Sequence, residues 1–316
     1  MYTGCEWEVQ TAVNAREALL EGPTEAVTAR PPERVSVVTD SLSWIPPDLA
    51  RELDIRIVPL HVAFGDEQYT ETIDITPQEF YRRLKESKVL PKTSQPSPGE
   101  FLDVYREVAK HADAILSVHA SSRLSGTYHS AETAAGLLRQ ERPDVRIECL
   151  DTLQIAMAEG IVAVRAAEAA ARGVPFDRIV ADARALLPKP QVLVVVETLE
   201  YLYRGGRIGR ARALLGGLLR IRPILTVADG EVTPKDRART RSQAMARVVD
   251  LMAEYAQGRP FGHVGVFHAE APDVAEELTA MIRSRFTVNR LVASELGPVI
   301  GTHVGPGAFG TTYHCD

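Results

Sequence analysis

The sequence of 316 residues is poor in cysteine, and its three cysteines, Cys5, Cys149 and Cys315, stand far apart. An odd number without a CxxC pair excludes a disulfide framework and a zinc knuckle. The eight histidines show no HExxH or paired spacing, so we expect no metal site. This cysteine usage is typical of a reducing cytoplasm, where we expect the protein to be located.

A long apolar run and an excess of positive charge are also missing. No stretch approaches the roughly 18 apolar residues of a membrane span, so we expect no integral membrane segment. The first ten residues, MYTGCEWEVQ, lack the apolar core of a secretory signal. The chain has 36 Lys and Arg against 42 Asp and Glu, a net charge of −6. This balance disfavours nucleic-acid binding, which depends on clustered cations that neutralise phosphates.

What is present is an ordinary globular composition, with 45% hydrophobic and 25% charged residues. At roughly 150 residues per domain, the length predicts two domains. We expect an N-terminal extension over residues 1–33, since Pro31-Pro32 ends that segment. An N-terminal α/β domain is then predicted over 34–152 and a C-terminal α/β domain over 153–316.

In the first half, short β-branched runs alternate with amphipathic segments. The predicted strands are 35–41, 55–63, 114–120 and 145–151. Helices are predicted from Thr76-Pro77, over 98–111 and after the polar stretch 121–128. The order β-β-α-α-β-α-β predicts a mainly parallel sheet with flanking helices.

The second half reads as a mixed α/β domain. Its predicted helices are 160–173, 176–187, about 240–256 and 272–286. Its predicted strands are 191–197, 261–270 and 290–296. A basic, glycine-rich segment lies between them, and Asp229-Gly230 marks a turn. The stretch 301–307, GTHVGPG, reads as a closing loop.

Three polar, loop-like segments are candidates for chemistry: 92–100, 121–128 and 301–307. Ligands bind at strand ends in open α/β folds, and free amides at a helix start favour an anion. The alternative is structural: Ser97 or Thr93 caps a helix in the first segment, and the serines of the second cap another. His303 stands between glycines, so a ligand role and simple packing are both open for it.

The basic segment also has two interpretations. Its arginines either form a solvated helix face, or one of them is buried and holds an anion while the others form a docking patch. The arginines in question are Arg204, Arg207, Arg210, Arg212, Arg237, Arg239 and Arg241.

Six motifs in one order resemble the DegV family over about residues 34–316. They are VTDS at 38–41, KTSQPSPGEF at 92–101, SSRLSGTYHSA at 121–131, LEYLYRGGRI at 199–208, RPILTVADGEV at 222–232 and GTHVGPGA at 301–308. That family includes the fatty-acid-binding subunits of bacterial fatty-acid kinase. The resemblance implies two α/β domains with one long-chain fatty acid buried between them and no further cofactor.

The resemblance also implies how such a ligand is used. A separate ATP-dependent kinase subunit phosphorylates the carboxylate to an acyl phosphate, so the binding protein is not itself a catalyst. By motif, Thr93, Ser125, His303 and Arg207 match the carboxylate-binding residues of the family. Arg210 and Arg239 match its basic residues for the kinase encounter. Transient contact with a membrane is compatible with this role.

Two other function classes remain open on the residues alone. A serine hydrolase would use Ser125, His303 and Asp40 as nucleophile, base and orienting acid, although no GxSxG elbow is present. A small-anion or nucleotide-binding protein would use the same helix starts, although the Walker and dinucleotide fingerprints are missing.

Overall fold

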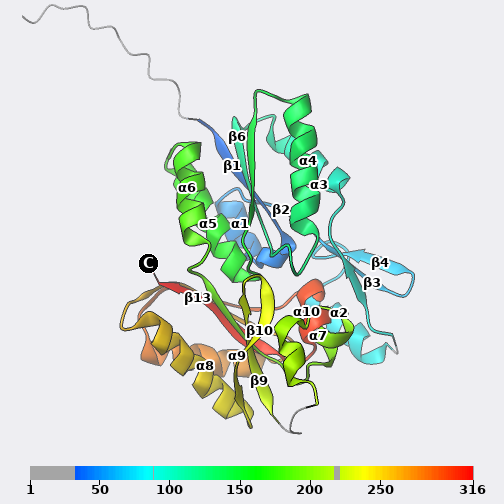
Figure 1. Cartoon of the computed structure of the whole chain (residues 1–316), viewed down its shortest axis with the longest axis vertical. Coiled ribbons are helices and arrows are strands. Elements are labelled where there is room, and N and C mark those ends of the chain that lie inside the picture. Colours follow the sequence, from blue (N-terminus) through cyan, green and yellow to red (C-terminus); the bar gives the residue numbers. More distant parts are fainter. Residues whose placement is uncertain (1–32, 88, 217–220, 316) are drawn as a thin grey trace, which may run out of the picture. The chain divides into compact units, whose positions relative to one another are not determined.

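A parallel four-stranded sheet forms the first half of the computed structural model, which describes residues 33–87, 89–216 and 221–315 (Figure 1). Its strands, in spatial order, are β2 (Arg56–Val58), β1 (Val35–Asp40), β6 (Ala114–His119) and β7 (Arg146–Asp151). Every pairing is parallel. β6 is buried along its whole length, which explains its continuous apolar sequence.

Helices cover both faces of this sheet. One apolar cluster joins the sheet to α1 (Pro47–Glu52), α5 (Met157–Ala171) and α6 (Phe176–Leu186). The other cluster joins it to α3 (Pro98–Val108) and α4 (Thr127–Glu141). Ser97 caps α3 in a reciprocal capping box with Glu100, so of the two capping candidates Ser97 is the cap.

The second half is built on a mixed six-stranded sheet. Its strands, in spatial order, are β10 (Glu231–Ala238), β9 (Arg222–Ala228), β8 (Gln191–Val195), β13 (Phe309–Cys315), β11 (Phe261–His268) and β12 (Val288–Glu295). Only β11 and β12 pair in parallel. α8 (Arg241–Ala256) and α9 (Pro272–Arg285) pack on one face through a continuous apolar cluster.

The other face of that sheet contacts a third group of elements. A small antiparallel sheet contains β4 (Glu67–Thr70), β3 (His61–Phe64) and β5 (Lys92–Ser94). Beside it lie α2 (Pro77–Glu86), α7 (Glu200–Arg204) and α10 (Pro298–Val304) (Figure 1). One apolar cluster includes residues of all these helices, of β3 and of the six-stranded sheet.

The predicted fold class, α/β with a mainly parallel first sheet and a mixed second one, is confirmed. The single strand predicted over 55–63 is wrong, because the segment divides into β2 and β3, which belong to different sheets. Pro59 lies at the division and has no N–H to donate to a ladder. The redirected β3 places residues of the small sheet beside the candidate site.

The expectation of a closing loop over 301–307 is also wrong. Residues up to Val304 belong to α10, and Gly305 ends that helix with a φ of 74°. The strand that follows it, β13, was not predicted. It pairs with both β8 and β11. Lys92–Ser94 is likewise a strand rather than a loop.

The extension 1–33 lies outside the described residues except for Glu33, as does Cys5. Cys149 and Cys315 are buried and form no disulfide. The division into domains at residues 152 and 153 stays a prediction.

Candidate functional site: an apolar cavity with one cationic wall

A largely apolar cavity lies against the face of the six-stranded sheet that α8 and α9 leave uncovered. About 900 Å³ in and around this cavity is free of atoms, a volume that includes open solvent. Leu, Val and Ile side chains from both halves supply most of its wall. The apolar lining is Leu42, Leu60, Leu124, Ile155, Ala156, Val192, Val194, Leu202, Val227, Val232, Phe267, Leu296, Val299, Ile300 and Val304.

The alternation of side chains along β8 builds this wall. Val192 and Val194 point into the cavity, whereas Leu193 and Val195 join the core under α8 and α9. Successive side chains of a strand face opposite sides, so one short apolar strand serves both the core and the cavity.

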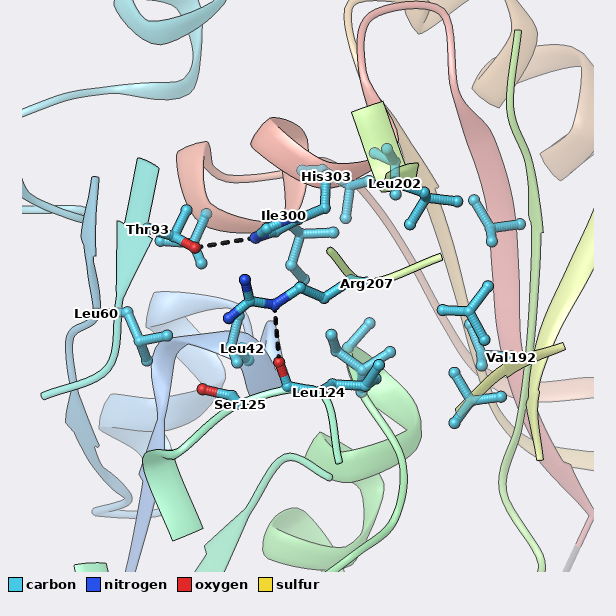
Figure 2. Close-up of a pocket in the computed structure, with 18 of the residues that line it drawn as sticks. Leu42, Leu60, Thr93, Leu124, Ser125, Val192, Leu202, Arg207, Ile300 and His303 are labelled. Carbon is cyan, nitrogen blue, oxygen red and sulfur yellow. Dashed lines mark hydrogen bonds between the residues drawn. The ribbon is translucent and has the colours of Figure 1, made fainter. Parts of the chain in front are cut away.

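Four segments distant in sequence bring the predicted polar residues together in this cavity. Thr93 comes from β5, Ser125 precedes α4, Arg207 follows α7, and His303 lies on α10. Figure 2 shows the Arg207 guanidinium between the pair Thr93–His303 and Ser125, with Val192 on the opposite side of the cavity. The cavity therefore has one polar, cationic wall and one apolar wall.

His303 is held as a neutral imidazole. Its Nε2 lies 2.9 Å from Thr93 Oγ1, and its buried Nδ1 has no partner among the described residues. Burial lowers the pKa of His303 to about 4, and the nearby charge of Arg207 adds to this effect. A β-carbon on Gly205 would collide with Nδ1, so only glycine permits this approach of the RGGR motif.

Arg207 brings a positive charge to the cavity wall. Its Nε donates to the carbonyl of Leu124 over 3.1 Å, and its Nη1 donates to the carbonyl of Gly205 over 2.8 Å. These two bonds orient the guanidinium without neutralising it. No carboxylate among the described residues forms an ion pair with Arg207, although most arginines of the chain have such a partner. The cavity thus offers a fixed cation to an anionic group.

Ser125 lies just before α4, and its Oγ accepts a hydrogen bond from the backbone N–H of Thr127, the first residue of that helix, over 3.3 Å. Its Oγ lies 2.7 Å from Thr127 Oγ1, and a β-carbon on the neighbouring Gly126 would collide with the amide of Gln95. Ser94 and Gln95 also line the cavity and are exposed, so the polar wall extends to the molecular surface. Sequence reasoning did not assign a role to either, although both stand in the segment 92–100.

The serine-hydrolase arrangement does not form. His303 bonds Thr93, Ser125 bonds Thr127, and Asp40 is buried beside a different histidine, His119. A nucleophile needs a base within hydrogen-bond distance, and Ser125 has no such contact in this structure.

The two predicted docking arginines lie outside the cavity lining. Arg210 pairs with Asp229 and Glu231 at 3.0 and 3.2 Å, and its side chain is 47% exposed. Arg239 is exposed, and its backbone N–H donates to Gln243. Both are therefore available to a protein surface rather than to a ligand in the cavity.

The described residues contain no group of three or more His, Cys, Asp or Glu side chains arranged to hold a metal ion. None of the helices described over 33–87, 89–216 and 221–315 is long and apolar enough to cross a membrane.

Comparisons with known proteins agree with one another. A model of the DegV family, described as uncharacterised proteins, matches residues 34–315. A DegV domain-containing protein of Caldanaerobacter subterraneus subsp. tengcongensis is 34% identical over 281 residues, which cover 89% of this chain and 99% of the relative. Protein DegV of Bacillus subtilis is 34% identical over 279 residues, 87% of this chain and 97% of that protein.

Solved structures resemble this chain in both fold and sequence. A DegV family protein of Thermus thermophilus, described as binding a fatty acid, has a TM-score of 0.83 and 37% identity, and covers 90% of this chain and 100% of its own. DegV of Bacillus subtilis, described as a fatty acid binding protein, has a TM-score of 0.79 and 34% identity with the same coverage. The match over nearly the whole described chain, in sequence and in fold, places this protein in the DegV family.

Proposed function

We propose that this protein binds one long-chain fatty acid in the cavity, with the carboxylate at Arg207 and the acyl chain along the apolar wall. The observation that carries the proposal is the unneutralised Arg207 guanidinium in an otherwise apolar cavity. A carboxylate that leaves water needs paired charge and hydrogen bonds. Arg207 supplies the charge, and the Thr93 and Ser125 hydroxyls with the His303 ring supply polar contacts.

The apolar wall accounts for affinity. At about 0.8 kcal/mol per buried methylene, about 14 methylenes contribute roughly 11 kcal/mol of gross transfer free energy. Lost translational and rotational freedom reduces this figure by several kcal/mol. A small anion or a nucleotide would leave the Leu, Val and Ile wall without a partner, so the cavity favours an acyl chain over these ligands.

Relatives support the same ligand class. The Thermus thermophilus and Bacillus subtilis proteins, similar to this chain over 90% of its length, are described as fatty-acid binding. No further cofactor is proposed.

The test is native mass spectrometry of the purified protein, followed by solvent extraction and identification of the lipid. We expect one saturated or unsaturated long-chain fatty acid per chain. A protein that carries no lipid, takes up no oleate and instead shows a thermal shift with ATP would overturn the proposal in favour of nucleotide binding.

We propose further that the bound fatty acid is presented to an ATP-dependent kinase subunit, so that this protein is a substrate-presenting subunit in the cytoplasm and not a catalyst. The polar wall extends to the surface at Ser94 and Gln95, which supports access to the carboxylate. Arg210 and Arg239 are the proposed docking residues. In a reconstituted assay of acyl-phosphate formation, Arg239→Ala should lower the rate and leave fatty-acid affinity unchanged. A parallel fall in affinity would assign Arg239 to the ligand site instead.

A further inference from the structure

Glu71 is a buried carboxyl group that joins three separate parts of the chain. It directly follows β4 and is only 1% exposed. Ser41, in the turn after β1, bonds its Oε2 over 2.5 Å. The backbone N–H of Val299, in the first turn of α10, donates to its Oε1 over 2.9 Å. One carboxyl group therefore ties the first sheet, the small sheet and α10 together.

The segments that Glu71 joins form the cavity wall. Leu42 follows Ser41, Leu60 donates its backbone N–H to Ser41 Oγ over 3.0 Å, and Val299 bonds Glu71 directly. All three of these residues line the cavity. α10 also carries His303, so its position relative to the first sheet sets the geometry of both walls.

Glu71 has no positive partner. Among the described residues no cation forms an ion pair with it, and the titratable groups around it are Asp40 at the end of β1 and Tyr81 of α2. Glu295, at the end of β12, adds a further negative charge near Tyr81. His303, at the other end of α10, is neutral because burial lowers its pKa. Burial, with a smaller contribution from Asp40, raises the pKa of Glu71 to about 7.

We propose that Glu71 is a positioning residue whose proton controls the closure of the cavity: the neutral carboxyl is stable in its buried place between α10 and the first sheet, whereas the ionised carboxylate, buried there without a cation, favours opening and speeds release of the bound fatty acid. The inference rests on the proposed fatty-acid binding. It adds a dependence on pH that the ligand site itself, with its neutral histidine and its arginine, does not supply near neutral pH.

The direction follows from linkage between proton binding and opening. A carboxyl group exposed by opening regains its ordinary pKa, whereas the closed cavity holds the higher value of about 7. Between these two values, opening becomes up to about tenfold more favourable for each pH unit. Above the closed-state pKa both states are ionised, and the effect levels off.

Two variants separate this effect from a structural role. Glu71→Gln keeps the size of the side chain. Its Oε1 can accept from the Val299 N–H and its amide NH₂ can donate to Ser41, so the variant reproduces the protonated state at every pH. Ser41→Ala removes a hydrogen bond that favours the ionised form, so the pH at which the effect levels off should move upward. Glu79→Gln, an exposed carboxyl on α2 that pairs with Arg82 and Arg83, is the matched control.

The experiment measures the dissociation rate of cis-parinaric acid, a fluorescent fatty acid, from the full chain between about pH 5 and about pH 8.5. As the pH increases, we expect the ratio of the wild-type rate to the Glu71→Gln rate to rise at least about tenfold and then to level off above neutral pH. The ratio of the wild-type rate to the Glu79→Gln rate should stay constant over the same range. Should Glu71→Gln fail to fold, as judged by circular dichroism, an unshifted profile in Ser41→Ala overturns the inference.

The outcomes distinguish the two proposals. Tight binding with a constant ratio of wild type to Glu71→Gln overturns the role of Glu71 and leaves fatty-acid binding intact. Absence of probe binding at every pH overturns both.

Discussion

Two buried histidines show how a structural network differs from a ligand site in this protein. His119, on β6, has both ring nitrogens bonded, to Asp40 over 2.9 Å and to Ser117 over 2.7 Å, and Ser117 in turn bonds Tyr105. His303 bonds only Thr93, and its other ring nitrogen has no partner among the described residues.

The charges around the two rings differ as well. His119 lies beside a carboxylate in a fully buried network, whereas His303 lies beside a guanidinium that no carboxylate of the described residues neutralises. The first network is complete without a ligand. The second gains hydrogen bonds and charge balance only when an anion arrives. The candidate site is therefore marked by the His303 group, whose hydrogen bonds and charge are not all paired, and not by the fully bonded His119 network.

The largest expected effect tests the complete network. His119→Ala leaves the Asp40 carboxylate buried without its partner, which should lower the free energy of unfolding by about 3–5 kcal/mol. Urea denaturation of the ligand-free protein measures this change. The exposed His111→Ala is the control, with an expected change below about 0.5 kcal/mol. A loss of less than 1 kcal/mol for His119→Ala would remove the contrast between the two histidines.

The second effect concerns the pH dependence that His303 gives to the ligand-free protein. Its folded-state pKa of about 4 lies below the ordinary 6.5. The contribution of His303 is therefore fully present above pH 6.5 and is lost as the pH falls toward the folded value. The stability difference between wild type and His303→Gln should change by about 3 kcal/mol across this window. This comparison cancels other titrating groups, Glu71 included, and a constant difference would contradict a neutral buried His303.

The third effect separates affinity from stability. Arg207→Ala should weaken fatty-acid binding by about 2–3 kcal/mol, roughly 30- to 150-fold, because it removes the only charge paired with the carboxylate. The free energy of unfolding of the ligand-free protein should change by less than about 1 kcal/mol. Calorimetric titration with oleate measures the first quantity. Arg204→Ala, on an exposed arginine that pairs with Glu200, is the control and should bind normally.

The smallest effect tests the packing behind His303. Gly205→Ala places a methyl group against His303 Nδ1 and should lower the free energy of unfolding by about 1–2 kcal/mol, with weaker oleate binding. Gly136→Ala, inside α4 with open space around it, should instead stabilise the fold by up to about 1 kcal/mol. Equal responses of the two variants in thermal unfolding would show that the contact with His303 is unimportant.

Local sequence patterns determined most of the elements. Thr76 and Ser97 cap α2 and α3 where capping chemistry predicts, and the continuous apolar run of β6 indicates a strand buried on both faces. These signals are local, so a single chain carries them without knowledge of its contacts. The polar residues Thr93, Ser125, Arg207 and His303 were predicted together only through the resemblance of their motifs to the DegV family, because local pattern left capping, packing and solvated roles open for them.

Tertiary structure alone decided the rest. Pro59 ends β2 locally, but only sheet pairing sends β3 to a different sheet, and only pairing with β8 and β11 makes β13 a central strand. Whether the hydrogen bonds of a buried ring are all made, as for His119, or only some of them, as for His303, depends on partners such as Asp40 and Thr93, which lie about 80 and 210 residues away. Spacing along the chain cannot encode that distinction, because hydrogen-bond partners meet through the fold and not through sequence proximity.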